Sequence, residues 1–252
     1  MKARRLIPLL SLLALLGGPA AVAAAERAPL RPKGVFGPLG NERLSNETTL
    51  TRWAHTNLRG PIWSKPTSVS TKIGKLRWDT EDRLPEVYVV LQSQLDAGDR
   101  AWLQIRIPGR PNGQVGWVRA DKLSNLKTIQ THLTIDRTKL KATLRKDGRR
   151  IWTSRVGVGA PGTKTPAGHF WIRERLSNLH GNPLYGPWAF GTSAYSETLT
   201  DWPGGGVIGI HGTNQPQLIP GRPSHGCVRV PNANIEKLAR LMPIGTPVSI
   251  VN

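Results

Sequence analysis

Residues 211–229 read His-Gly-Thr-Asn-Gln-Pro-Gln-Leu-Ile-Pro-Gly-Arg-Pro-Ser-His-Gly-Cys-Val-Arg, and this stretch is the most informative part of the chain for both fold and chemistry. Cys227 is the only cysteine of the 252 residues, so it cannot form a disulfide within the chain. A lone cysteine is exposed to oxidation outside the cell, where the N-terminal signal described below would send it. Its place beside histidine therefore indicates a reactive thiolate.

A thiol at this position needs a base, because free cysteine has a pKa of about 8.5 and is mostly protonated at neutral pH. A neighbouring histidine can accept the proton. His225 is two residues from Cys227 and would share its face in an extended strand, unless Gly226 makes a tight turn. His211 is distant in sequence and depends on the fold to come close. Spacing alone leaves both histidines open as the base.

The N-terminus has the pattern of an export signal. Basic Lys2, Arg4 and Arg5 precede an apolar run at 6–16, and Ala23-Ala24-Ala25 offers a small-residue cleavage site before Glu26. We predict a signal peptide at 1–25, and hence a periplasmic or extracellular cell-wall location. The alternative is a retained membrane anchor, for which eleven apolar residues are short.

The chain is strongly basic, with a formal charge of +19 that falls to +16 when the three basic residues of the signal are removed. Such a charge attracts polyanions. No nucleic-acid-binding motif is present, so we expect an anionic cell envelope rather than nucleic acid as partner, with membrane contact only transiently during export. A basic surface that serves solubility alone is the competing interpretation.

The rest of the chain reads as two β-rich domains after a Pro- and Gly-containing linker or irregular arm at 26–50. Short strand-like runs within 51–124 are separated by turn residues and predict a small all-β barrel. The runs lie at 53–58, 86–91, 101–107 and 114–119.

A second domain is predicted at 127–251. Its strand-like runs lie at 130–136, 139–145, 151–158, 169–173, 207–210 and 248–251. Asp147-Gly148 is a hairpin turn signal. Asn232 can cap a short helix with an apolar face at i, i+3, i+4 and i+7, formed by Ile235, Leu238, Ala239 and Met242.

Two motifs in this second domain resemble those of the L,D-transpeptidase (YkuD) family. One is the 211–229 stretch, with a histidine, a spacer and then Ser-His-Gly-Cys followed by Arg; the other is Thr165-Pro-Ala-Gly-His-Phe170. The resemblance implies a β-sandwich with a short helix near the catalytic cysteine. Upstream, the segment 114–123 resembles the last hairpin of bacterial SH3-type domains, with Trp117 in the core.

The family resemblance also assigns roles to residues. Cys227 becomes the nucleophile and His211 the general base, oriented by the carbonyl of Gly212. The backbone N–H groups of Gly226 and Cys227 form an oxyanion hole. The remaining assignments are pocket residues His225 and Ser224, and Arg229, which would bind a substrate carboxylate.

The implied reaction is a two-step acyl transfer on peptidoglycan stem peptides that makes 3→3 cross-links through a thioester and needs no cofactor. With water as acceptor, the protein would be an L,D-carboxypeptidase. Carbapenem-type β-lactams are expected to acylate the thiol. The segment 176–206 carries the aromatics Tyr185, Trp188, Phe190 and Tyr195, which either form a lid over the site or serve only as packing. In the lid interpretation, Tyr185 and Trp188 bind substrate.

Three competing interpretations remain. His211, His225 and Cys227 could supply zinc ligands, although no His-Glu-x-x-His or Cys-x-x-Cys pattern is present. The chain could be a non-catalytic wall-binding protein built on the same fold. Cys227 could also be an ordinary buried cysteine, although its glycine and histidine neighbours favour chemistry.

Overall fold

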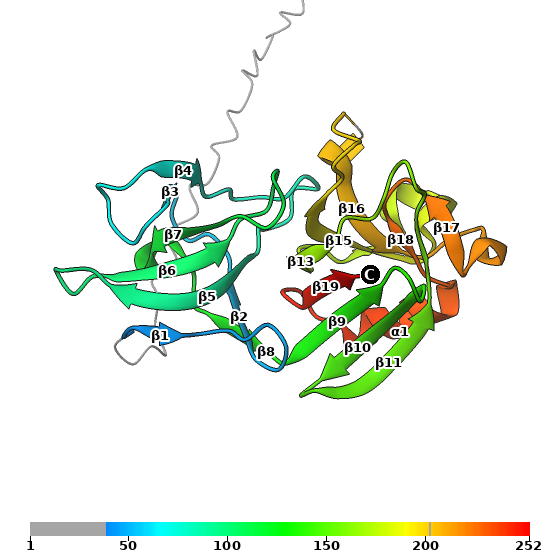
Figure 1. Ribbon diagram of the computed structural model, residues 1–252, viewed down its shortest axis with the longest axis horizontal. Helices are drawn as coiled ribbons and strands as arrows, with labels where there is room; N and C mark the ends of the chain where they lie inside the picture. Colours follow the sequence, from blue (N-terminus) through cyan, green and yellow to red (C-terminus); the bar gives the residue numbers. More distant parts are fainter. Residues whose placement is uncertain (1–38, 202) are drawn as a thin grey trace, which may run out of the picture.

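The structure is a computed structural model that describes residues 39–201 and 203–252. The described chain forms two β-rich units that lie side by side, the first up to residue 129 and the second from residue 131 (Figure 1). The predicted signal peptide at 1–25 and the first part of the predicted arm lie outside the described residues. Within the described ranges, no helix has the length and apolar character needed to cross a bilayer.

The N-terminal unit is built on an eight-stranded antiparallel sheet in the order β4-β3-β7-β6-β5-β2-β8, with β1 paired to β5. Its elements are β1 (Glu42–Arg43), β2 (Thr51–Ala54), β3 (Pro61–Trp63), β4 (Lys72–Lys75), β5 (Tyr88–Leu95), β6 (Ala101–Arg106), β7 (Val115–Arg119), the 3-10 turn η1 (Ala120–Lys122) and β8 (Lys127–Ile129).

The four runs predicted as strands correspond to β2, β5, β6 and β7, and Trp117 is buried as expected. The predicted boundaries of this unit are too narrow. Part of the predicted arm pairs with β5 through β1, while Leu39 and Leu44 pack against the core. On the other side, β8 pairs with β2. Short polar segments of this kind carry no periodicity, so the sequence could not reveal their pairing.

The C-terminal unit contains two sheets. The five-stranded sheet has the order β11-β10-β9-β19-β13, and the six-stranded sheet the order β14-β15-β16-β18-β12-β17. The first sheet comprises β9 (Thr131–Asp136), β10 (Lys141–Lys146), β11 (Arg149–Arg155), β13 (Gly168–Trp171) and β19 (Pro247–Val251). The second comprises β12 (Gly157–Gly159), β14 (Leu176–Ser177), β15 (Trp188–Tyr195), β16 (Val207–His211), β17 (Gly221–Ser224) and β18 (Val228–Arg229).

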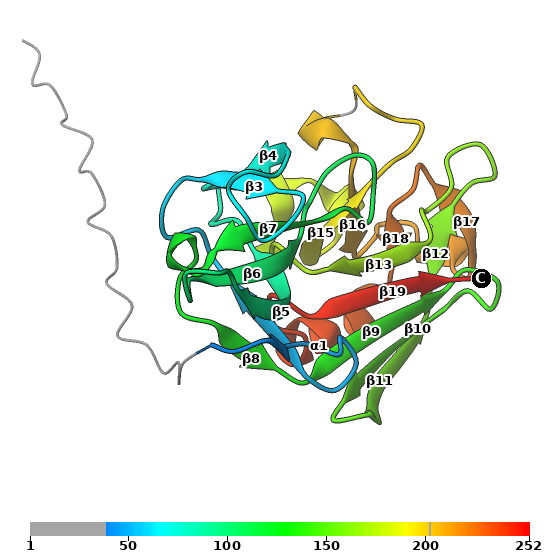
Figure 2. The ribbon, with the colours of Figure 1, turned by 60° about the vertical axis from the view of Figure 1, so that its left-hand side comes forward.

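Short 3-10 turns connect these strands: η2 (Leu179–Gly181), η3 (Pro183–Tyr185), η4 (Pro203–Gly206) and η5 (Pro216–Leu218). The closing strand β19 lies between β9, with which it runs parallel, and antiparallel β13 (Figure 2). Asp147 and Gly148 adopt φ values of 51° and 74° between β10 and β11, which confirms the predicted hairpin turn.

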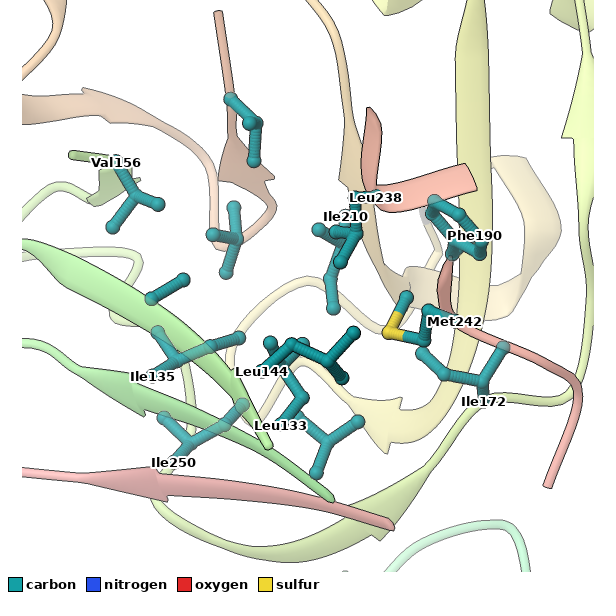
Figure 3. Close-up of a cluster of buried hydrophobic side chains, with 14 of the residues drawn as sticks. Leu133, Ile135, Leu144, Val156, Ile172, Phe190, Ile210, Leu238, Met242 and Ile250 are labelled. Atoms are coloured by element: carbon teal, nitrogen blue, oxygen red, sulfur yellow. The ribbon is translucent and has the colours of Figure 1, made fainter. Parts of the chain in front are cut away.

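One large apolar core joins the two sheets and the helix α1 (Asn232–Leu241). Side chains from β9, β10 and β19 face Phe190 and Ile210 of the second sheet, with Leu238 and Met242 beside them (Figure 3). The predicted apolar helix face is confirmed by the burial of Ile235, Leu238, Ala239 and Met242. The predicted cap is wrong, because Pro231 is the N-cap residue and the Asn232 side chain accepts the Thr213 N–H at 2.8 Å.

The two units share a buried interface. In the run Val87–Val90, Tyr88 and Val90 enter the core of the N-terminal unit, while Val87 and Val89 enter a second cluster with Trp53 and Trp171. Because side chains alternate along a strand, this run is apolar on both faces. The Trp171 indole donates to the Val87 carbonyl at 2.8 Å. The C-terminal unit therefore contributes both a side chain and a hydrogen bond to this second cluster.

Candidate active site

Cys227 is placed by two parallel strands. Register pairs join Ile210 to Val228 and His211 to Arg229, so Cys227, just before β18, lies beside Gly209 of β16. The Gly209 N–H donates to the Cys227 Sγ at 3.3 Å. A Cβ atom built on Gly209 would be 3.7 Å from both this sulfur and the His211 Cδ2. Gly209 therefore marks the point where thiol and imidazole converge.

His211 ends β16 and is 5% exposed. Its Nδ1 lies 2.6 Å from the carbonyl oxygen of Gly212. A carbonyl oxygen only accepts, so Nδ1 carries the proton and Nε2 keeps its lone pair. The ring also packs edge-on against Tyr185, with centroids 5.0 Å apart. These contacts fix the tautomer that a general base requires.

Burial governs the protonation of both groups. It lowers the pKa of His211 from 6.5 to about 4, with Arg229 adding to the effect and the Gly212 carbonyl opposing it. Burial raises the pKa of the Cys227 thiol, while the Gly209 N–H and Arg229 oppose the rise. At neutral pH the site therefore holds a neutral imidazole and a protonated thiol.

The loop before the thiol is held by hydroxyl groups. Ser224 Oγ donates to the Cys227 carbonyl at 2.5 Å and accepts the Gly226 N–H at 3.2 Å. Thr165, 1% exposed, donates to the Gly226 carbonyl at 2.7 Å. Gly226 has φ 123°, and a Cβ there would lie 2.8 Å from the Ile208 side chain, so only glycine fits.

This bonding bears on the predicted oxyanion hole. The Gly226 N–H is already engaged by Ser224, so it would have to be shared or released to bind an oxyanion. Gly212 contributes its carbonyl to His211 instead of lining the thiol's surroundings. A side chain there would lie 2.5 Å from the Asn232 Oδ1, which explains the glycine.

Two cavities border the thiol. The first, of about 280 Å³, is lined by the predicted residues Ser224, exposed His225 and Arg229, together with His211 and Cys227. The second, of about 200 Å³, also contains His211 and Cys227. Tyr185 lines both cavities. The Arg229 guanidinium donates to the Gln215 side chain at 2.9 Å, and its buried Nε has no hydrogen-bond partner among the described residues.

The aromatics of 176–206 do not form one lid. Much of that segment is secondary structure: β14, the 3-10 turns η2, η3 and η4, and the eight-residue strand β15 (Trp188–Tyr195). Trp188 packs against the core under Arg175 and is not among the described lining residues of either cavity, so its substrate contact stays a prediction. Phe190 is fully buried, although it also borders the second cavity. Tyr195 lies in the interface between the units.

The N-terminal unit reaches the wall of the first cavity. The Arg110 guanidinium donates to the carbonyls of Ser196, Leu199 and Gly205 at 2.8, 3.2 and 2.9 Å. Ser196 and Leu199 line the first cavity, as does Gly206. Asn112 adds a reciprocal pair of bonds to the Tyr195 backbone, at 2.8 and 2.9 Å. One loop of the first unit therefore holds the cavity wall of the second.

Comparison with known proteins places this site in a family. The L,D-transpeptidase catalytic domain, YkuD, matches residues 130–250. The YkuD protein of Bacillus subtilis (strain 168), itself only provisionally assigned as an L,D-transpeptidase, is 31% identical over 156 residues, which cover 62% of this chain and 79% of that protein. This chain belongs to the L,D-transpeptidase (YkuD) family.

Solved structures also match the chain. Bdellovibrio bacteriovorus Bd1075 is 30% identical, with 49% of this chain and 48% of that chain covered and a TM-score of 0.39. The catalytic domain of the E. faecium L,D-transpeptidase is 25% identical, with 48% and 96% covered and a TM-score of 0.36. Both motifs of the chain, 165–170 and 211–229, lie inside the YkuD match.

Several residues of the YkuD site were not predicted to take part. Gly209, Glu174 and Asp82 gained no role from sequence, and Asn232 was predicted only to cap a helix. The contacts that bring these residues to the thiol, to the Gly212 turn or to the second cavity depend on the fold. Thr165 was recognised as part of a motif, but its hydrogen bond to the Gly226 carbonyl was not predicted. In the described part of the chain, no three His, Cys, Asp or Glu side chains are grouped as a metal site would require.

Proposed function

We propose that this family member is a peptidoglycan L,D-transpeptidase that works through a thioester on Cys227. The observation that carries the proposal is the pairing of a thiol beside Gly209 with a buried imidazole whose Nδ1 proton is held by the Gly212 carbonyl. This leaves one nitrogen lone pair of His211 as the base in the cavities that contain the thiol.

In the first step the thiol attacks the carbonyl of the L-centre third residue of a donor stem tetrapeptide. The thiol is protonated at neutral pH, so its proton passes to His211 Nε2 as the C–S bond forms. His211 then returns this proton to the departing amine of D-alanine as the C–N bond breaks. The product is a thioester on Cys227 and free D-alanine.

In the second step the amine of another stem attacks the thioester. The new C–N bond forms, the C–S bond breaks, and the amine proton returns through His211 to the sulfur. A 3→3 cross-link results. If water takes the place of the amine, the product is a free tripeptide and the protein acts as an L,D-carboxypeptidase.

Arg229 suits the donor's terminal carboxylate. It is half-buried in the first cavity and its Nε has no hydrogen-bond partner within 39–201 and 203–252, so a carboxylate there would satisfy a buried donor. The Cys227 N–H, with the Gly226 N–H if Ser224 releases it, is the proposed oxyanion hole. The same thiol is the proposed site of acylation by carbapenem-type β-lactams.

The proposal places the protein outside the cytoplasm, where peptidoglycan is found, after export by the signal at 1–25. The N-terminal unit is proposed to be an SH3-like module, on the strength of the 114–123 hairpin with buried Trp117. The net charge of +16 suits an anionic wall.

Intact mass spectrometry tests the function. The protein is incubated with a disaccharide tetrapeptide, alongside a Cys227→Ala variant. We expect an acyl adduct on the wild type only, followed by cross-linked dimer. Free tripeptide without dimer would mean carboxypeptidase activity. The absence of both an adduct and D-alanine release would favour a wall-binding protein instead.

A further inference from the structure

The two cavities that meet at Cys227 carry opposite charge. The first contains Arg229 and no acidic side chain among its described lining residues. In the second, the charged lining residues are Asp82 and Glu174, and none of the described lining residues is Lys or Arg. We call the second space the acidic cavity. A cationic ligand would be attracted by the carboxylates of the acidic cavity and repelled by Arg229 in the first cavity.

Glu174 is the unusual residue of the acidic cavity. It is 2% exposed, and its Oε1 has no hydrogen-bond partner among the described residues. Its carboxyl group lies over Gly191, another lining residue, because a Cβ at 191 would fall 2.0 Å from the Glu174 Oε2. A buried carboxyl oxygen without a partner is costly, so the site is suited to a ligand that donates hydrogen bonds.

The surroundings of Glu174 point the same way. Burial is the main cause that raises the pKa of Glu174, and Asp82 and Glu81 raise it further. A side-chain hydrogen bond with Thr80 and the charge of Arg173 oppose the rise. Arg173, the cation that lowers the pKa of Glu174, already donates to Glu86 at 2.7 Å and to Glu81 at 2.9 Å. A positive group that entered the cavity would relieve the repulsion and supply the missing donor.

Asp82 comes from the N-terminal unit and is exposed at the acidic cavity. Its position is fixed by its neighbours, since Glu81 pairs with Arg77 and Arg173, both at 2.9 Å. The turn is closed by the Thr80 N–H, which donates to the Leu84 carbonyl at 2.7 Å. The N-terminal unit therefore contributes a charge to the approach to the thiol.

We propose that the acidic cavity binds the primary ammonium group of the acceptor stem, with Glu174 as its hydrogen-bond acceptor and Asp82 as an attracting charge at the entrance. This inference rests on the proposed transpeptidase function. The ammonium gives one proton to the Glu174 carboxylate, which passes it to solvent, and becomes a neutral amine. That amine attacks the thioester, the C–S bond breaks, and its second proton reaches the sulfur through His211.

The test separates transfer from acylation. Glu174→Gln keeps the shape of the side chain and removes its charge, and Asp82→Asn does the same at the entrance of the acidic cavity. Glu236→Gln, on the exposed face of α1, is the matched control. For each protein, mass spectrometry measures acylation of Cys227 by the tetrapeptide donor without acceptor. The ratio of cross-linked product to hydrolysed tripeptide is then measured against acceptor concentration.

We expect Glu174→Gln to acylate within twofold of wild type and to lower the transfer-to-hydrolysis ratio at least tenfold, with a higher KM for the acceptor. Asp82→Asn should lower the ratio two- to threefold, and Glu236→Gln should not change it. Normal transfer by Glu174→Gln, or an equal loss of acylation and transfer, overturns the proposal. If Glu174→Gln fails to fold, an unchanged ratio in Asp82→Asn overturns it. A wild-type protein that is never acylated refutes the proposed function instead.

Discussion

Replacement of Arg173 by methionine tests whether a buried ion pair holds the two units together. Arg173 is 1% exposed, and its guanidinium contacts both carboxylate oxygens of fully buried Glu86 at 2.7 Å across the interface. Removal of one partner from a buried pair typically costs 3–5 kcal/mol, because the other charge stays buried. Glu86 keeps a 2.7 Å contact with Arg77, so we expect about 3 kcal/mol, at the lower end.

Urea unfolding followed by tryptophan fluorescence measures this cost, and a thermal melt should show Tm lower by roughly 6–12 °C. The double variant Arg173→Met/Glu86→Gln should recover part of the loss, because it removes the stranded charge. Arg100→Met is the control: Arg100 is 59% exposed in its pair with Asp96, so its loss should cost less than about 1 kcal/mol. A cost for Arg173→Met as small as that of the control would refute the reasoning.

Four further outcomes are expected. Because burial raises the pKa of Cys227, the rate of its alkylation by iodoacetamide should keep rising with pH up to and beyond pH 9. A plateau below pH 8 would contradict a protonated Cys227 thiol beside a neutral His211 at neutral pH. Arg110→Gln removes the bonds that hold the wall of the first cavity, so it should raise the donor KM about tenfold and leave iodoacetamide alkylation of Cys227 unchanged. An unaltered KM would show that Arg110 does not position this wall. Thr165→Val strands the Gly226 carbonyl and the Gly159 N–H, so it should cost about 1–3 kcal/mol of stability and slow donor acylation, whereas Thr165→Ser should resemble wild type. The pKa of His211 falls from 6.5 to about 4 on folding, so the unfolded chain binds more protons between these pH values; stability should drop by roughly 3 kcal/mol as pH falls through this window, with a shallower drop in His211→Asn.

The elements with strong local signals could be predicted from the sequence alone. Alternating apolar residues and Asp147-Gly148 predicted the β9–β11 region, and the i, i+3, i+4, i+7 pattern predicted α1. The 211–229 stretch identified the thiol and its histidines, because a single cysteine with such neighbours has few chemical uses. These features depend on residues close together in the chain, so the order of residues in the sequence is enough to predict them.

Which of those residues lie in contact depends on long-range packing. Spacing left His211 and His225 open, and the parallel pairing of β16 with β18 brought His211 to the thiol while leaving His225 exposed. The same long-range packing set Trp188 against the core and brought Arg110 and Asp82 of the first unit to the two cavities. Contacts between residues more than 80 positions apart depend on how whole sheets pack, and no local pattern in the sequence encodes them.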